Sequence, residues 1–297
     1  MPAERKPARP EPRVGVRKTY KLYIGGAFPR SESGRSYVVE DAEGGFLANA
    51  ALASRKDARD AVSAAAKAGP GWSARTAYNR GQILYRIAEM LEGRRDQFTT
   101  EVAAGEGVPR KAADVVVSAA IDRWVWYAGW ADKITQVLGS SNQVAAPYFD
   151  FSVPEPTGTV AVVAPQDSSL LGLVSVVAPA IVSGNTVVVL AAETRPLPAV
   201  TLTEVLATSD LPGGVVNLLT GRVAEVAPWL ASHMEVKAID LTGVTDAELA
   251  TDLERSAADN LKRVVRPTTG ADWNVDPGLD RLRAFLETKT VWHPVGI

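Results

Sequence analysis

The sequence predicts an α/β fold: a Rossmann-like parallel sheet with flanking helices, accompanied by a small β hairpin. Between residues 154 and 270, short β-branched runs alternate with segments of helical length, which is typical of parallel strands buried on both faces. Residues 55–130 repeat apolar side chains at the helical period. Residues 141–153 instead show a period of two, which indicates an extended hairpin.

The composition restricts the chemistry that these residues can perform. A chain of 297 residues with 46% hydrophobic content can bury a large core, and a net charge of −2 offers no basic surface to nucleic acid. The sequence contains no cysteine, which excludes disulfides, thiolate metal ligands and a thiol nucleophile. His233 and His293 are too far apart in sequence to suggest a metal site, and we expect His233 at the surface.

The N-terminus and the longest apolar run bear on localisation. Residues 1–19 contain four prolines and six Arg or Lys residues without an apolar core, which predicts a disordered tail rather than a signal peptide or a basic binding arm. The run Leu170–Val182 is shorter than the ~20 residues that span a membrane, so it predicts a buried helix. We therefore expect a cytoplasmic protein without membrane contact.

The part before the hairpin is predicted to be mainly helical. In chain order we expect a hairpin over Lys21–Arg35, a helix over Arg55–Ala68 capped by Ser54, a helix over Tyr78–Ala104 and a third helix from Pro109. The third helix carries Trp124, Trp126 and Trp130, which we expect in the core because no basic groove accompanies them.

The hairpin over residues 141–153 is predicted to project from the helices. Its bend lies near Pro147. The alternation places two sets of side chains on opposite faces: Phe149, Phe151 and Val153 on one, and Tyr148, Asp150 and Ser152 on the other.

A strand–helix alternation follows the hairpin. We predict strands at Thr159–Val163, Thr186–Leu190, Val215–Leu218, Ala238–Leu241 and Lys262–Arg266, and helices at Leu170–Val182, Pro198–Ala207, Val223–Ala231 and Asp246–Ser256. The dinucleotide fingerprint G-x-G-x-x-G does not follow the first strand. A short helix, Leu279–Glu287, and a strand, Thr288–Trp292, complete the predicted elements.

Five ordered motifs carry a family resemblance: Tyr127–Lys133, Glu155–Val160, Ala178–Val188, Leu211–Asn217 and Leu241–Gly243. Together they resemble the nucleotide-binding half of aldehyde dehydrogenases, enzymes that oxidise aldehydes through a thiolate. The resemblance divides the chain into a tail (1–19), the helical part of the nucleotide-binding domain (20–140), an oligomerisation hairpin (141–153), the Rossmann-like sheet (154–270) and a C-terminal helix and strand (271–297).

The resemblance does not extend to the positions of the family's catalytic residues. The family's Pro-Trp-Asn, whose asparagine stabilises an oxyanion, corresponds here to Pro165-Gln166-Asp167. A carboxylate would oppose the developing charge, and we expect Asp167 to cap the next helix instead. The general-base glutamate aligns with Pro267. With no cysteine either, the resemblance implies no catalytic residue.

The resemblance also implies a reduced set of cofactor contacts. The family's Lys-Pro-Ala-Glu, which holds the adenosine ribose, corresponds to Leu190–Glu193, and Thr242-Gly243 stands on the nicotinamide side. Val244 and Glu248 replace a serine and a glycine, and Glu248 would repel a pyrophosphate. We expect no cofactor, with weak NAD binding left open and no metal. The vestigial cofactor residues are Glu193, Gly221, Thr242 and Gly243.

The end of the chain resembles the C-terminus of full-length family members, which implies that the catalytic domain is missing from between residue 270 and the tail. In the family, this terminal strand and the hairpin form a sheet that extends the catalytic-domain sheet of a neighbouring subunit. The implied interface residues are Tyr148, Phe149, Phe151, Val153, Val291 and Trp292.

These observations favour a non-catalytic subunit that assembles with a full-length aldehyde dehydrogenase paralogue as a hetero-oligomer. Two alternatives stay open: an NAD(P)-type nucleotide-binding module, and an oxidoreductase with residual NAD-dependent activity on aldehydes. Ser168 and Ser169 follow the first strand of the sheet, but no histidine base accompanies them in the sequence.

Overall fold

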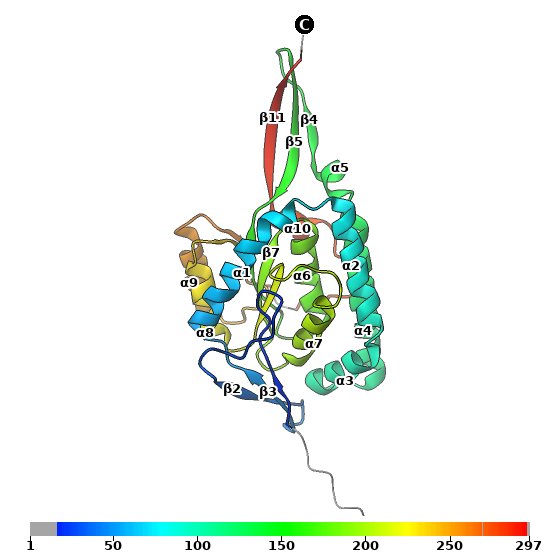
Figure 1. The fold of residues 1–297 in the computed structure, drawn as a ribbon, viewed down its shortest axis with the longest axis vertical. Coiled ribbons are helices and arrows are strands. Elements are labelled where there is room, and N and C mark those ends of the chain that lie inside the picture. Colours follow the sequence, from blue (N-terminus) through cyan, green and yellow to red (C-terminus); the bar gives the residue numbers. More distant parts are fainter. Residues whose placement is uncertain (1–16, 269, 296–297) are drawn as a thin grey trace, which may run out of the picture.

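A computed structural model describes residues 17–268 and 270–295. Its centre is a five-stranded parallel sheet in the order β10-β9-β6-β7-β8 (Figure 1). The predicted α/β class is therefore confirmed. The strands are β6 (Thr159–Val163), β7 (Thr186–Leu190), β8 (Val216–Leu219), β9 (Val236–Asp240) and β10 (Arg263–Val265).

Helices cover both faces of the sheet because successive strand side chains point in opposite directions. In β6, Val160 and Val162 belong to one core cluster, whereas Ala161 and Val163 belong to the other. The first cluster includes residues of α2 (Ala77–Glu92), α3 (Arg95–Glu106), α4 (Arg110–Trp130), α6 (Leu171–Val182) and α7 (Leu197–Leu206). The second includes residues of α1 (Arg55–Ser73), α8 (Val223–Ser232) and α9 (Ala247–Ala258).

The predicted buried helix is α6, whose residues are all buried beneath α4. Among the described helices, none combines the length and apolarity needed to cross a bilayer. Trp124 is fully buried in α4, as expected, while Trp126 and Trp130 pack against the same core from partly buried positions.

The structure corrects two N-terminal predictions. The predicted helix over Tyr78–Ala104 is two helices, because Gly93 ends α2 and Arg94 leaves the helical conformation before α3. The predicted hairpin over Lys21–Arg35 is wrong: this segment is a loop with a tight turn at Gly25-Gly26, held by isolated bridges.

The N-terminal hairpin lies further along the chain. It consists of β2 (Ser36–Glu40) and β3 (Phe46–Ala51), and β1 (Thr19–Tyr20) runs parallel to β3. Of the tail predicted over residues 1–19, residues 1–16 lie outside the described part, and Thr19 belongs to β1.

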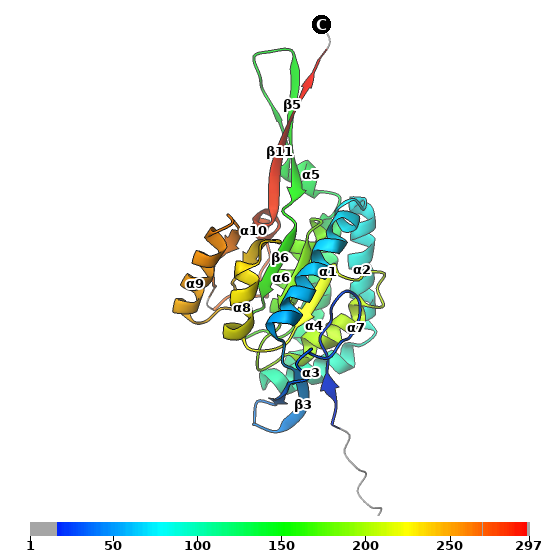
Figure 2. The same ribbon diagram turned by 60° about the vertical axis from the view of Figure 1, so that its left-hand side comes forward.

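A second, three-stranded sheet projects from the body (Figures 1 and 2). Its order is β11-β5-β4, with β4 at Ser140–Asn142, β5 at Tyr148–Pro156 and β11 at Leu286–Pro294. The predicted pairing of hairpin and terminal strand is confirmed, in an unbroken antiparallel register from Leu286 opposite Pro156 to Pro294 opposite Tyr148. The predicted final helix is shorter, since α10 spans Asp280–Ala284 and the strand begins at Leu286. α5 (Ile134–Leu138) precedes β4.

Candidate functional site

The four candidate cofactor residues all follow carboxyl ends of strands in the parallel sheet, the edge at which such folds bind ligands. Glu193 follows β7, Gly221 follows β8, and Thr242 and Gly243 follow β9. Each of these residues already has a partner or a steric role within the chain, as the following contacts show.

Glu193 stabilises the start of α8. Its Oε1 accepts a hydrogen bond from the Val223 backbone N–H, and Oε2 lies 3.5 Å from Arg222 Nη1. A carboxylate at this position favourably meets the partial positive charge of a helix N-terminus. The Glu193 N–H donates in turn to Gln166 Oε1 at 2.9 Å. The carboxylate that could accept from a ribose is therefore engaged with its own fold.

The two glycines allow close approach of backbone segments. A Cβ on Gly243 would lie 1.8 Å from the Ala164 carbonyl oxygen at the end of β6. Gly221 has φ +151° and a hypothetical Cβ only 3.3 Å from the Ala53 nitrogen. Tight backbone packing excludes a side chain at Gly243, whereas the positive φ of Gly221 disfavours one there. Packing and backbone conformation therefore account for glycine at these positions.

Thr242 belongs to a buried ionic cluster that the sequence did not reveal. Its hydroxyl donates to Asp240 Oδ1, and its N–H donates to the same oxygen at 2.9 Å. Arg281 from α10 donates to Asp240 Oδ2 at 2.8 Å and to Thr242 Oγ1 at 3.1 Å. Asp240 is 0% exposed. Burial raises the pKa of Asp240, and the neighbouring Arg281 opposes that rise.

The same C-terminal segment is fixed at further points. Arg123, buried in α4, donates to the carbonyl oxygens of Trp273 at 2.7 Å and Val275 at 3.0 Å. Asn185 donates to the Phe285 carbonyl at 2.9 Å, and the Phe285 ring is fully buried. The segment from Trp273 to Phe285 is thus anchored to the Rossmann-like body immediately before β11.

The predicted interface residues all lie on the projecting sheet. Trp292 lies directly opposite Asp150, which is two residues from Tyr148 in β5, so Tyr148 and Trp292 share a face, and their ring centroids are 5.8 Å apart. Phe149 and Phe151 lie on the other, with centroids 5.4 Å apart. Tyr148, Phe149 and Trp292 are exposed, and the remaining three, Phe151, Val153 and Val291, are half-buried.

Within the part of the chain that the structure describes, no strand pairs with the outer edge of β11, whose backbone groups are therefore exposed there. In an antiparallel ladder, alternate residue pairs exchange hydrogen bonds. Thr157 N–H donates to the Phe285 carbonyl and Val295 N–H donates to the Pro147 carbonyl, which fixes the odd-numbered residues of β11 as those bonded to β5. The N–H groups of the even-numbered Thr288, Thr290 and Trp292 therefore point away from β5.

Comparisons with known proteins agree with this arrangement. The profile of the aldehyde dehydrogenase family matches residues 28–275. The chain belongs to the aldehyde dehydrogenase family. It is 34% identical to retinal dehydrogenase 2 of Gallus gallus over 272 residues, which cover 90% of this chain and 52% of that protein. Cytosolic 10-formyltetrahydrofolate dehydrogenase of Mus musculus is 32% identical over 85% of this chain and 28% of its own length.

Solved aldehyde dehydrogenase structures match the fold. HpcC from Thermus thermophilus superimposes with a TM-score of 0.79 and 31% identity over 83% of this chain and 47% of that chain. An NAD+ complex of the aldehyde dehydrogenase from Bacillus cereus gives a TM-score of 0.78 and 25% identity, over 83% of this chain and 50% of that chain. The chain thus spans about half the length of these aldehyde dehydrogenases.

The loop that carries the oxyanion asparagine in aldehyde dehydrogenases is tied down by internal contacts here. Gln166 donates to the Ala164 carbonyl at 2.7 Å. The predicted cap by Asp167 is wrong: α6 begins at Leu171, and the Ser168 hydroxyl accepts from the Gly172 N–H at 2.9 Å. Ser169 is buried and donates both its N–H and its hydroxyl to Glu106 Oε1 at 2.7 Å.

The structure assigns no histidine to these serines, because His233 ends α8 and His293 lies in β11. His233 is half-buried rather than fully at the surface, and burial lowers its pKa. Asp240 and Arg281 are the polar residues that sequence reasoning missed. The one available signal was an aspartate directly after the apolar pair Ala238-Ile239 in a predicted buried strand.

Proposed function

We propose that this chain is a non-catalytic aldehyde dehydrogenase subunit that assembles with a full-length paralogue and supports it. The single observation that carries the proposal is the intact β11-β5-β4 sheet, which projects from the body with its outer edge unpaired (Figure 2). The sequence combines that assembly element with a lack of cysteine and a proline, Pro267, at the general-base position.

Strand addition is the mode of binding that this edge supports. The outward N–H groups of Thr288, Thr290 and Trp292 can each pair with a carbonyl of a partner strand, and the main-chain bonds would supply adhesion. Exposed, unpaired strand edges are otherwise a liability that proteins cover or block. A partner strand removes that liability.

The exposed aromatic side chains would add apolar contact. Phe149 and Trp292 are 52% and 58% exposed. Full burial of such a side chain contributes about 1.5–3 kcal/mol, so covering the exposed half of each would contribute roughly 1 kcal/mol. That contribution is modest, and the backbone edge is therefore the main determinant of binding.

A full-length partner fits better than a second copy. By the family resemblance, the edge adds to a catalytic-domain sheet, and the sheets formed by residues 17–268 and 270–295 do not include such an acceptor. A twofold dimer would need donor and acceptor on each copy. A paralogue with a catalytic domain supplies the acceptor.

The contacts at the carboxyl ends of the parallel strands count against the two alternatives, a nucleotide-binding module and residual aldehyde oxidation. A nucleotide-binding module would need Glu193 and Thr242 available, but Glu193 holds α8 and Thr242 holds Asp240 and Arg281. Residual aldehyde oxidation would need a nucleophile, and Ser169 is buried against Glu106. Both alternatives are tested by adding NAD and aldehyde to the pure chain and recording reduced cofactor.

The test of the proposal is co-expression of the tagged chain with a full-length aldehyde dehydrogenase from the same genome. We expect the dehydrogenase to co-purify and its melting temperature to rise in the complex. Thr288→Pro removes an outward N–H without breaking the ladder to β5, because proline is tolerated at such edge positions. It should abolish co-purification, while Thr288→Val, which keeps the N–H, should not.

A second pair of variants, a test and a matched control, examines the exposed aromatic side chains. Phe149→Ser should weaken the complex, whereas Tyr85→Ser on α2, equally exposed at 51%, should leave it unchanged. A lone monomer that captures no dehydrogenase, or undiminished capture by Thr288→Pro, would contradict the proposal.

A further inference from the structure

A cavity of about 640 Å³ opens between the start of α1 and the end of α8, and its lining residues all lie outside the projecting sheet. Its lining includes Arg55, Lys56 and Arg59 from α1 and Trp229, His233 and Met234 from α8 and the residues after it, together with one carboxylate residue, Glu32, and the serines Ser54 and Ser232. Its volume falls within the ~300–1,000 Å³ range of small-molecule sites.

The basic residues of the cavity lie at the N-terminus of α1, where cations destabilise a helix. Arg55 and Lys56 are the first two residues of α1, and Arg59 follows one turn later. The N-terminus of a helix carries a partial positive charge, so cations there are unfavourable. Departures from such local rules are expected at functional sites.

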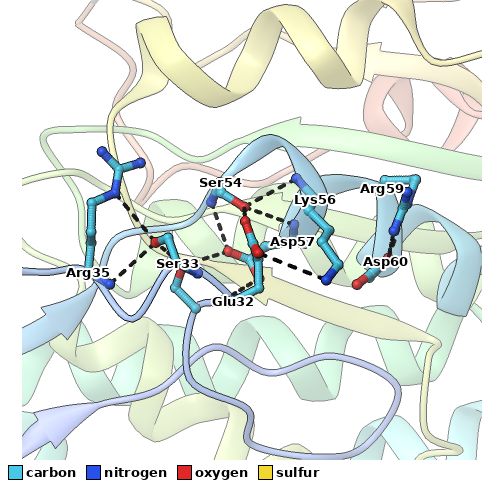
Figure 3. A network of polar contacts seen from close by, with 9 residues as sticks. Glu32, Ser33, Arg35, Ser54, Lys56, Asp57, Arg59 and Asp60 are labelled. Atoms are coloured by element: carbon cyan, nitrogen blue, oxygen red, sulfur yellow. Dashed lines mark hydrogen bonds and ion pairs between the residues drawn. The ribbon is translucent and has the colours of Figure 1, made fainter.

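Nearby carboxylates compensate this charge only in part (Figure 3). Asp57 is buried and occupied by the Ser31 hydroxyl and by the N–H groups of Glu32 and Ser54, at 2.8–3.1 Å. Its carboxylate therefore caps the helix.

Of the other carboxylates, Glu32 lies 3.9 Å from Lys56, and Asp60 pairs with Arg59 at 3.0 Å. No ion pair within residues 17–268 and 270–295 engages Arg55. The cavity thus keeps a cationic rim.

The opposite wall is apolar and accessible. The Trp229 indole is 41% exposed, and the Arg55 guanidinium lies 4.1 Å from its ring centroid. Met234 is 66% exposed. His233 Nδ1 accepts from the Glu235 N–H at 3.2 Å, which leaves Nε2 as the donor of the neutral ring. A flat apolar wall therefore faces a set of cationic donors.

We propose that this cavity binds a small organic anion, namely a flat apolar ring that carries a phosphate or carboxylate group. Trp229 and Met234 contact the ring, and Arg55 and Lys56 bind the anionic group. The cavity lining does not include Glu193: its carboxylate binds the N–H of Val223 at the start of α8, and Trp229 lies about 9 Å further along that helix at 1.5 Å per residue. The cavity is also independent of the assembly proposed above.

Calorimetric titration of the isolated chain tests the proposal, with 1-naphthyl phosphate and 1-naphthoate as complete ligands, inorganic phosphate and acetate as their respective anionic halves, and 1-naphthol as the aromatic half of both. At least one complete ligand should bind at least tenfold tighter than either of its halves. The ratio of the two complete ligands then identifies the preferred anionic group. Arg55→Gln and Trp229→Leu should each weaken binding at least tenfold, whereas Arg255→Gln, an exposed arginine of α9, should have no effect.

Three outcomes would overturn the proposal. One is the absence of binding at millimolar ligand. Another is equal binding of inorganic phosphate and naphthyl phosphate, which would mean that the apolar wall is not used. The third is binding that survives both cavity variants but is lost in Glu193→Gln, which would place the ligand at the carboxyl ends of the parallel strands. Each titration uses the chain without a partner, so failure of the assembly proposal does not affect the result.

Discussion

Replacing Arg281 by methionine would leave the carboxylate of Asp240 buried without its cationic partner. Asp240 is 0% exposed, and the Arg281 side chain is 19% exposed, so water can replace the lost guanidinium only poorly. Removal of one partner from a buried ion pair costs about 3–5 kcal/mol. For a domain of this size the melting temperature should fall by roughly 10 °C.

The loss should depend on pH in a defined direction. Burial raises the pKa of folded Asp240 above the ordinary value of 3.8, and Arg281 lowers it. Without Arg281 the folded pKa of Asp240 rises further, so the contribution of this carboxyl to stability is fully present below the ordinary value and is lost as pH rises through the folded value. The deficit relative to the wild type should therefore be larger at pH 8 than at pH 5.

Urea unfolding followed by circular dichroism at both pH values measures this effect. The double variant Asp240→Asn/Arg281→Met removes the buried charge as well, and it should recover at least half of the lost stability. A deficit below about 1 kcal/mol that is equal at both pH values and unchanged in the double variant would refute the reasoning.

Three other changes test the remaining anchors. Asn185→Ala removes the bonds to Gly158 and Phe285 and should cost about 2–3 kcal/mol; limited proteolysis should then release β11 faster, and an unchanged cleavage rate would contradict this. Ser54→Ala removes the cap of α1 and should cost about 1 kcal/mol by urea unfolding, with Ser63→Ala as the exposed control. Trp72→Phe loses the buried bond to the Ile181 carbonyl, 2.8 Å long, and should cost about 1–3 kcal/mol; a melting temperature equal to the wild type would show that the bond is replaced.

The parallel sheet was the most predictable part of the fold. The bounds of β6 and β7 match the prediction, because both are fully buried runs rich in β-branched residues that begin directly after Gly158 and Asn185. The break between α2 and α3 was missed because one glycine within a periodic segment does not by itself end a helix. Here Arg94, at the break, also pairs with Glu204 of α7 at 2.7 Å, a tertiary contact that the sequence does not show.

The sequence indicates which strand ends carry the candidate site residues, but not which contacts those residues make. Glu193 follows β7, and Thr242 and Gly243 follow β9, so all three lie on the side of the sheet that the carboxyl ends of parallel strands share. Their engagement with Val223, Arg281 and Ala164 depends on contacts between residues distant in the sequence. Arg281 lies 41 positions after Asp240, in a segment whose course over the sheet only the structure reveals.

Residue-resolved hydrogen exchange on β11 tests the central claim most directly. In the isolated chain, the amides of Lys289 and Val291 should exchange slowly because they bond to β5, and those of Thr288, Thr290 and Trp292 should exchange fast. After mixing with a full-length aldehyde dehydrogenase, the three fast amides should become protected. Continued fast exchange at all three, in a mixture where both chains are folded, would contradict assembly through this strand edge.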